Sequence, residues 1–195
     1  MSKAVPILNR NLALLLPLLL SAFPAAADVH GRVVSVHDGD TLTVLVERRQ
    51  VRVRLTDIDA PELGQPFGTR SRQSLSSLCF GKIATLDVRG QDRYRRTLAR
   101  VTCAGSDANA EQVRRGYAWV FVRYVHPDSP LLAIQNEART SHRGLWQDTD
   151  PVAPWEWRRN LRQSMRMSGA RSSLMRRDPA SASPEKPATI ELEMH

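Results

Sequence analysis

Three clusters of charged residues in this 195-residue sequence have the types and spacing needed to bind a metal ion and a phosphate. They are residues 37–41 (His-Asp-Gly-Asp-Thr), 52–62 (Arg-Val-Arg-Leu-Thr-Asp-Ile-Asp-Ala-Pro-Glu) and 92–100 (Asp-Arg-Tyr-Arg-Arg-Thr-Leu-Ala-Arg). Each has a simpler interpretation on its own. Asp38-Gly39 is a common hairpin turn, Arg52 and Arg54 suit a solvated strand face, and the third cluster suits a basic hairpin tip.

Taken together, the three clusters predict a more specific chemistry. Asp40, Asp59 and Glu62 are carboxylates at strand ends, and Arg54 and Arg96 belong to two different strands. Two aspartates and a backbone carbonyl would hold a hard cation such as Ca²⁺, with positions left for water and a phosphate oxygen. A glutamate could take a proton from the attacking water, and two arginines could stabilise the charge that develops on phosphorus. This combination is what hydrolysis of a phosphodiester requires.

The elements that must position these residues begin with three short strands. Apolar and polar residues alternate from Val29 onward, which is typical of strands with one buried face. The apolar positions are Val34 and Val36, then Leu42, Val44 and Val46, then Val51, Val53 and Leu55. Turns at 38–40 and 47–50 separate the strands, and 83–88 and 97–101 predict two more.

Three helices are predicted among and after these strands. The first covers 68–79, the second covers 107–115, and the third begins at Ser129-Pro130. Asp107 or Asn109 is the expected N-cap of the second helix, and Gly116 follows its last turn. Five strands and three helices, with most strands first, predict an α+β fold with a mainly β core: a small β-barrel with helices attached.

Composition excludes several other classes of protein. Two cysteines rule out a disulfide-dense scaffold and a four-ligand zinc module, and neither phosphate-binding glycine motif is present. The 28 basic and 20 acidic residues give a net charge of +8, and all basic residues but Lys3, Lys82 and Lys186 are arginine. Such a balance suits a nucleic-acid partner, although an arginine-rich solvated surface would explain it equally well.

The two ends of the sequence differ from the middle. Lys3 and Arg10, the apolar stretch 12–20 and Ala25-Ala26-Ala27 form the pattern of a signal peptide cut after Ala27, which predicts a secreted or periplasmic protein. No apolar run is long enough to span a membrane. We expect the folded domain to cover 28–160, and 161–195 to be a basic, disordered tail.

Cys79 and Cys103 are the two cysteines of the chain. In an oxidising compartment they could form a disulfide that closes the segment between them. Two buried free thiols are the alternative, and the sequence does not separate the two.

The three clusters in this order and spacing resemble the staphylococcal nuclease (thermonuclease) family, in particular its exported bacterial members. The resemblance covers about 29–159 and includes 38–41 (Asp-Gly-Asp-Thr), Arg54 with 59–62 (Asp-Ala-Pro-Glu), and 92–96 (Asp-Arg-Tyr-Arg-Arg). It implies a five-stranded OB-fold barrel with three helices and Ca²⁺-dependent cleavage of DNA and RNA.

The resemblance also implies roles for individual residues. Asp40, Asp59 and the carbonyl of Ala60 correspond to metal ligands, Glu62 to the general base, Arg54 and Arg96 to phosphate clamps, and Arg93 and Tyr94 to substrate contacts. Two positions depart from the family pattern. Ala60 replaces a threonine, which a carbonyl ligand tolerates, and Arg95 replaces a glycine. If the turn at Arg95 needs a positive φ, a non-glycine residue there costs roughly 1–2 kcal/mol.

Two other functions compete with a nuclease. A non-catalytic OB-type module would bind nucleic acid without cutting it, but such members typically lose the acidic or arginine positions that this chain keeps. A structural envelope protein would explain export and charge but not the carboxylate spacing. We expect a monomer whose partner is DNA, RNA or both.

Overall fold

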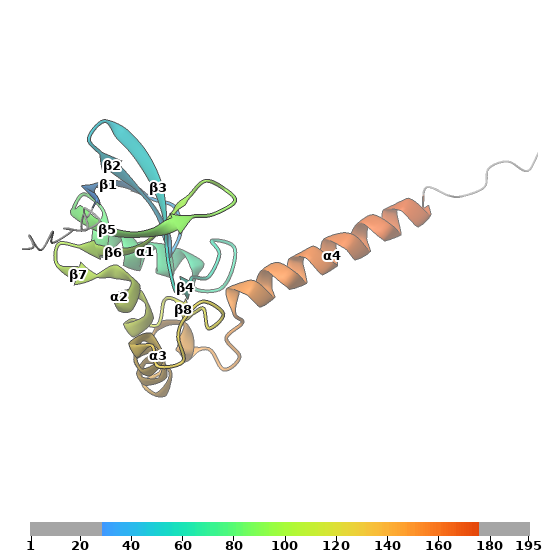
Figure 1. The fold of residues 1–195 in the computed structure, drawn as a ribbon. Helices are drawn as coiled ribbons and strands as arrows, with labels where there is room; N and C mark the ends of the chain where they lie inside the picture. The colour runs from blue at the N-terminus through green and yellow to red at the C-terminus, as the bar shows by residue number, and fades with distance from the viewer. Residues whose placement is uncertain (1–28, 176–195) are drawn as a thin grey trace, which may run out of the picture.

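A computed structural model describes residues 29–175 of the chain (Figure 1). The predicted leader, 1–27, lies outside these residues, as does the end of the predicted tail, 176–195. The strands are β1 (Val29–Val36), β2 (Thr41–Val46), β3 (Arg49–Leu55), β4 (Ile58–Asp59), β5 (Ile83–Gln91), β6 (Thr97–Cys103), β7 (Ser106–Asp107) and β8 (Trp119–Val120). The helices are α1 (Gly68–Cys79), α2 (Ala108–Arg114), α3 (Pro130–Thr140), the short 3₁₀ helix η1 (Gly144–Gln147) and α4 (Pro154–Met175).

Five strands close into a barrel, as expected from the sequence. They are hydrogen-bonded in the order β3-β2-β1-β5-β6, and β3 then pairs with β6 to complete the circle. This last pairing is parallel, with Arg54 opposite Leu98, whereas the other pairings are antiparallel. The alternation in the sequence reports the inner face correctly, because Val53 and Leu55 are buried while Arg52 is exposed.

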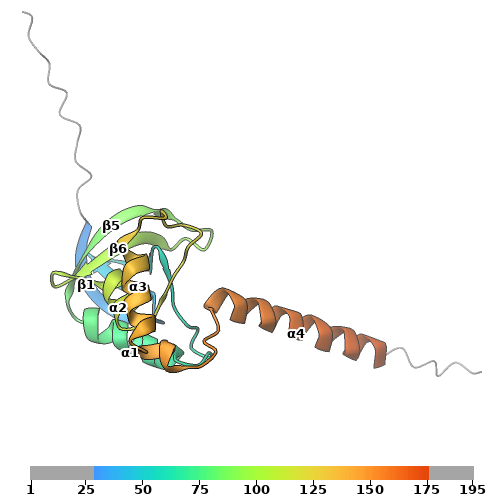
Figure 2. The same cartoon turned by 90° about the horizontal axis from the view of Figure 1, so that it is seen from below.

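Helices α1, α2 and α3 lie together beside the barrel, and the core runs between them and the strands (Figure 2). Helix α2 begins as predicted at Asp107, whose side chain accepts a hydrogen bond from the amide of Ala110. Asn109, the alternative cap, is buried instead: its side chain accepts from the amide of Val101 and donates to the carbonyl of Thr56. It therefore ties the helix to the barrel.

The structure joins Cys79 to Cys103 by a disulfide, with a Cα–Cα distance of 5.2 Å. Cys79 is the last residue of α1 and Cys103 the last of β6, so the bond connects the helix to the barrel wall. Both residues are fully buried. The second alternative from the sequence, two free thiols, is not what the structure contains.

Residues 161–175, which the sequence analysis assigns to the tail, continue helix α4 in the structure. An extended apolar face that would mark a packed helix is missing from 159–168, where all side chains are exposed and the apolar residues are Leu161, Met165 and Met167. Proline at the first position and the arginine, leucine, methionine and glutamine residues that follow later in the segment favour helical backbone. No described helix is both long and apolar enough to cross a bilayer.

Candidate active site

The centre of the site is an arginine that holds two aspartates. One guanidinium nitrogen of Arg54 bonds to the carboxylate of Asp40, and the other lies 2.7 Å from Asp59 Oδ1. The exposed fractions of the Asp40 and Asp59 side chains are 1% and 0%, and that of Arg54 is 19%. Arg54 therefore does not belong to a solvated strand face, unlike Arg52. It turns toward the acids at the end of β3.

The turn between β1 and β2 places Asp40. The side chain of Asp38 accepts a hydrogen bond from the Asp40 amide, and the Asp40 carbonyl accepts one from the amide of Leu55. Gly39 lies against α1, where a Cβ atom would collide with the side chain of Ser71. This glycine is required for the close approach of the turn to the helix.

A two-residue strand places Asp59. Strand β4 pairs with β8, with Asp59 opposite Trp119. The amide of Ala60 then donates to Asp40 Oδ2 over 2.7 Å, so the Ala60 peptide is fixed directly beside both carboxylates. Cluster 37–41 and cluster 52–62 thus converge at one end of the barrel, as the sequence predicts.

Burial and charge act in opposite directions on these groups. Burial raises the pKa of Asp40 to about 7, and the nearby Asp38 and Asp59 add to this, while Arg54 opposes it. Burial alone would lower the pKa of the Arg54 guanidinium, but Asp40 and Asp59 hold that pKa above its usual value. Two carboxylates so close together in a buried position favour any cation that can join them.

Glu62 lies at the open edge of this cluster, and a second arginine binds it. The exposed fraction of the Glu62 side chain is 42%, so water and substrate can reach it. Arg158, from the first turns of α4, places Nη1 2.7 Å from Glu62 Oε1 and Nη2 2.6 Å from Asp59 Oδ2. Arg158 was not predicted from the sequence.

The path of the chain before α4 explains why Arg158 reaches the site. The side chain of Gln65 accepts from the amide of Glu62 and donates to the carbonyl of Val152. This amide ties the loop that carries Glu62 to the segment that leads into α4. In the sequence, Pro154 as a helix start was the available signal, since it places Arg158 one turn into a helix.

Arg96 is held by its own loop and not by the acidic cluster. Asp92 Oδ1 accepts from the backbone amides of Tyr94 and Arg96, and Asp92 Oδ2 accepts from the Arg96 side chain at 2.8 Å. These hydrogen bonds outweigh partial burial and lower the pKa of Asp92. Strand β6 is parallel to β3, and its first residue, Thr97, lies opposite Val53. The loop 92–96 that leads into β6 is therefore on the same side of the barrel as Arg54.

The remaining loop residues are exposed. Tyr94 has 64% of its surface exposed, and the guanidinium of Arg93 lies 4.8 Å from the centre of its ring. Arg95 has a φ of 63°, so the turn does require the left-handed conformation that glycine would adopt without cost. The hydrogen bonds to Asp92 close the turn in spite of that strain.

The donor set fits a hard cation. The groups that converge are carboxylates with a backbone peptide beside them, and Ca²⁺ takes such oxygen ligands in flexible geometry. Within residues 29–175 no group of three or more histidine, cysteine, aspartate or glutamate side chains is placed to share a metal. A cation here would therefore take Asp40 and Asp59 as side-chain ligands and complete its shell with backbone oxygen and water.

Comparison with known proteins finds a matching family model and similar relatives. Residues 52–148 match the family model described as staphylococcal nuclease homologue. An uncharacterized endonuclease of Escherichia coli O157:H7 is 47% identical over 147 residues, which are 73% of this chain and 95% of the relative. A micrococcal nuclease of Shigella flexneri is 43% identical over 151 residues, covering 72% and 87% of the two chains. An uncharacterized endonuclease of Haemophilus influenzae is 43% identical over 135 residues, covering 69% and 75%.

The barrel, the site and these relatives define a phosphodiester-hydrolysing endonuclease. The chain belongs to the staphylococcal nuclease family.

Proposed function

We propose that this endonuclease is a calcium-dependent enzyme that hydrolyses DNA, RNA or both, with Glu62 as the general base. The observation that carries the proposal is the buried Asp40–Arg54–Asp59 cluster with the exposed Glu62 at its edge. Buried carboxylates are costly unless they are paired, so a cluster of this kind at the end of a barrel indicates a functional site.

Each residue has a part in the proposed reaction. Asp40, Asp59 and the carbonyl of Ala60 would hold Ca²⁺, which when bound supplies positive charge against a phosphate oxygen. Glu62 takes a proton from the attacking water, whose oxygen bonds to phosphorus. Arg54 and Arg96 stabilise the charge that grows on the phosphate oxygens. The bond from phosphorus to the sugar oxygen opposite the water breaks, and that oxygen leaves with the bonding electrons and takes a proton from solvent. Arg93 and Tyr94 contact the substrate beside the site.

Glu62 can act as a base only after its present partner moves. Its carboxylate forms an ion pair with Arg158, and the same guanidinium also pairs with Asp59. A cation and a phosphate that arrive together supply both a competitor for Asp59 and a new anion for Arg158. The exchange would free Glu62 for water.

We also propose that the protein is exported after cleavage behind Ala27, since the first 27 residues have the pattern of a signal peptide. N-terminal sequencing of the protein from the periplasm and from the medium tests this. Recovery of intact chains starting at Met1 inside the cell only would contradict it.

Incubation of the purified protein with plasmid DNA and with bulk RNA, in calcium and in chelator, tests the main proposal. We expect fragments in calcium and intact nucleic acid in chelator. Retarded but uncut nucleic acid in calcium would instead indicate a binding module, and equal cutting in chelator would exclude the calcium dependence.

A further inference from the structure

Helix α4 extends away from the barrel. Both views show its later turns projecting from the domain, with only the beginning of the helix close to the rest of the molecule (Figures 1 and 2). The first turn is anchored by Trp155, whose ring stacks on Phe121 at 5.3 Å, and by the ion pairs of Arg158. From 159 to 168 every side chain is exposed.

An arginine row runs along this helix and begins at the active site. We define it as Arg158, Arg162 and Arg166, which are spaced four residues apart and therefore lie on one face, about 6 Å apart along the axis. Arg159 lies beside the row. In 154–168 the one acidic residue is Glu156, and it lies 3.8 Å from Arg159 rather than against the row.

The spacing and position of this row fit the backbone of a nucleic acid. A strand carries about one negative charge per 3.4 Å of duplex axis, so three arginines along about 12 Å meet several phosphates. Arginine binds phosphate with a planar fork. Arg158, the first member of the row, pairs with Glu62 and therefore lies at the proposed point of cleavage. The charge and the continuity with the active site both select the substrate as the occupant.

We propose that α4 is a substrate-binding arm, in which Arg162 and Arg166 bind phosphates of the nucleic acid beyond the segment that lies in the active site. The inference rests on the proposed function for the nature of the substrate. The arm adds length to the binding surface and takes no part in the bond-breaking step. Its benefit is therefore confined to substrates long enough to reach it.

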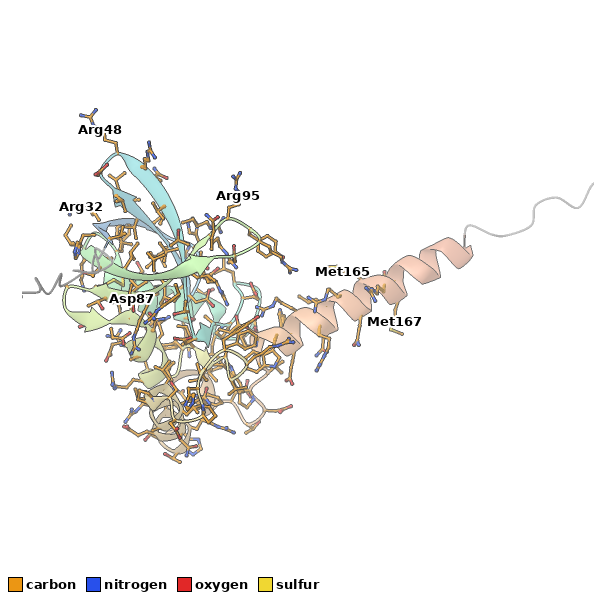
Figure 3. The ribbon with its side chains drawn as sticks, in the orientation of Figure 1. Arg32, Arg48, Asp87, Arg95, Met165 and Met167 are labelled. Atoms are coloured by element: carbon orange, nitrogen blue, oxygen red, sulfur yellow. A yellow bond between two sulfur atoms is a disulfide. The ribbon has the colours of Figure 1, made fainter. Side chains whose placement is uncertain are left out.

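The apolar residues of α4 offer a competing occupant. Leu161 and Met165 are one turn apart and exposed, as is Met167; Figure 3 shows Met165 and Met167 on the projecting helix. A second copy of the chain could pack there as a helix pair. The arginine row is favoured because it is continuous with the site, whereas these three side chains border no other exposed apolar residue of α4 up to 168.

The test compares R162Q/R166Q with a matched control, R48Q/R49Q. Arg48 and Arg49 are exposed, and Figure 3 shows Arg48 at a hairpin tip far from α4, so the control loses the same charge elsewhere. Glutamine is as good a helix former as arginine, and circular dichroism checks that α4 persists. Fluorescence anisotropy in chelator then measures the affinity of the full-length protein for a long duplex over a range of salt concentrations.

We expect R162Q/R166Q to bind the long duplex about tenfold more weakly at low salt, and its salt dependence to be shallower by about 1.8, as for two lost phosphate contacts. The control should change much less in slope. Equal losses in both variants, or no loss in either, would overturn the inference. The inference would also be overturned if the wild type sedimented as a dimer that L161S/M165S dissociates and R162Q/R166Q kept full affinity for the duplex.

Cleavage of a short oligonucleotide that fills only the active site separates this inference from the proposed function. R162Q/R166Q should cut it at the wild-type rate in calcium while cutting the long duplex more slowly under subsaturating conditions. If the wild type cuts neither substrate, the proposed function fails whatever α4 does. If all variants cut both substrates alike, only the substrate-binding arm is excluded.

Discussion

The guanidinium of Arg158 lies 2.6 Å from Asp59 Oδ2, although 99 residues separate the two in the chain. Arg158 is positive and occupies oxygens that a metal ion would need, so it competes with calcium. We expect R158Q to bind Ca²⁺ roughly tenfold more tightly, a change of about 1.4 kcal/mol. Isothermal titration without nucleic acid measures it.

A neighbouring arginine supplies the control for this measurement. Arg159 is on the same turn of α4, and its ion pair among the described residues is with Glu156 at 3.8 Å. R159Q removes the same charge and should leave calcium affinity nearly unchanged. Unchanged or weaker binding by R158Q would show that Arg158 does not compete for the carboxylates.

Glu62 is expected to carry the proton transfer. Glu62→Gln keeps the size of the side chain but cannot accept a proton from water, so the single-turnover rate should fall roughly 10²–10⁴-fold. The side chain is 42% exposed, and therefore thermal unfolding should be little affected. Wild-type turnover in this variant would mean that another group takes the proton.

Arg54 joins two carboxylates with the two ends of one fork. Lysine cannot contact Asp40 and Asp59 in the same way, since its ammonium is a single point charge. We expect Arg54→Lys to lose at least roughly a hundredfold in the rate of the chemical step, as for removal of one stabilising donor. The metal-free variant should also unfold at lower temperature, because a buried carboxylate loses its partner. Full activity and full stability together would contradict a bridging role.

Asp92 positions Arg96 through the side chain and the backbone of that residue. Asp92→Asn should lower kcat, by less than Arg96→Gln does, because the clamp loses its support but not its charge.

The pKa of Asp92 lies below its ordinary value of 3.8. A lowered acid pKa contributes stability above pH 3.8, and this contribution disappears as the pH falls through the lower, folded-state pKa. Carboxyl NMR should show the Asp92 midpoint below 3.8; a midpoint at or above 3.8 would mean that the loop is not held this way.

The disulfide between Cys79 and Cys103 closes a loop with a sequence separation of 24. Such a cross-link is worth about 3 kcal/mol of unfolding free energy by chain entropy. Urea unfolding of the wild type with and without reductant should show this difference. C79A/C103A, in contrast, should not respond to reductant. Two reactive thiols in the denatured, unreduced wild type would disprove the pairing.

Local pattern in the sequence was enough for the barrel and most of its helices. Alternation at Val51, Val53 and Leu55 reports which face of β3 is buried, because side chains on a strand point to opposite sides in turn. Capping residues report where helices begin for an equally local reason: Asp107 bonds an amide three residues away. Local pattern was not enough for the later turns of α4, which are helical although residues 159–168 bury no apolar side chain.

The composition and spacing of the charged residues indicated the kind of chemistry, since carboxylates and arginines at strand ends suit a cation and a phosphate whatever their exact contacts. Only the tertiary structure decided which charges meet. In the structure Arg54 pairs with Asp40 and Asp59, and Arg96 pairs with Asp92. Arg158 pairs with Glu62, which is 96 residues away in the chain. Such pairs depend on the path by which the chain returns to the barrel, and that path is set by packing rather than by any nearby residues.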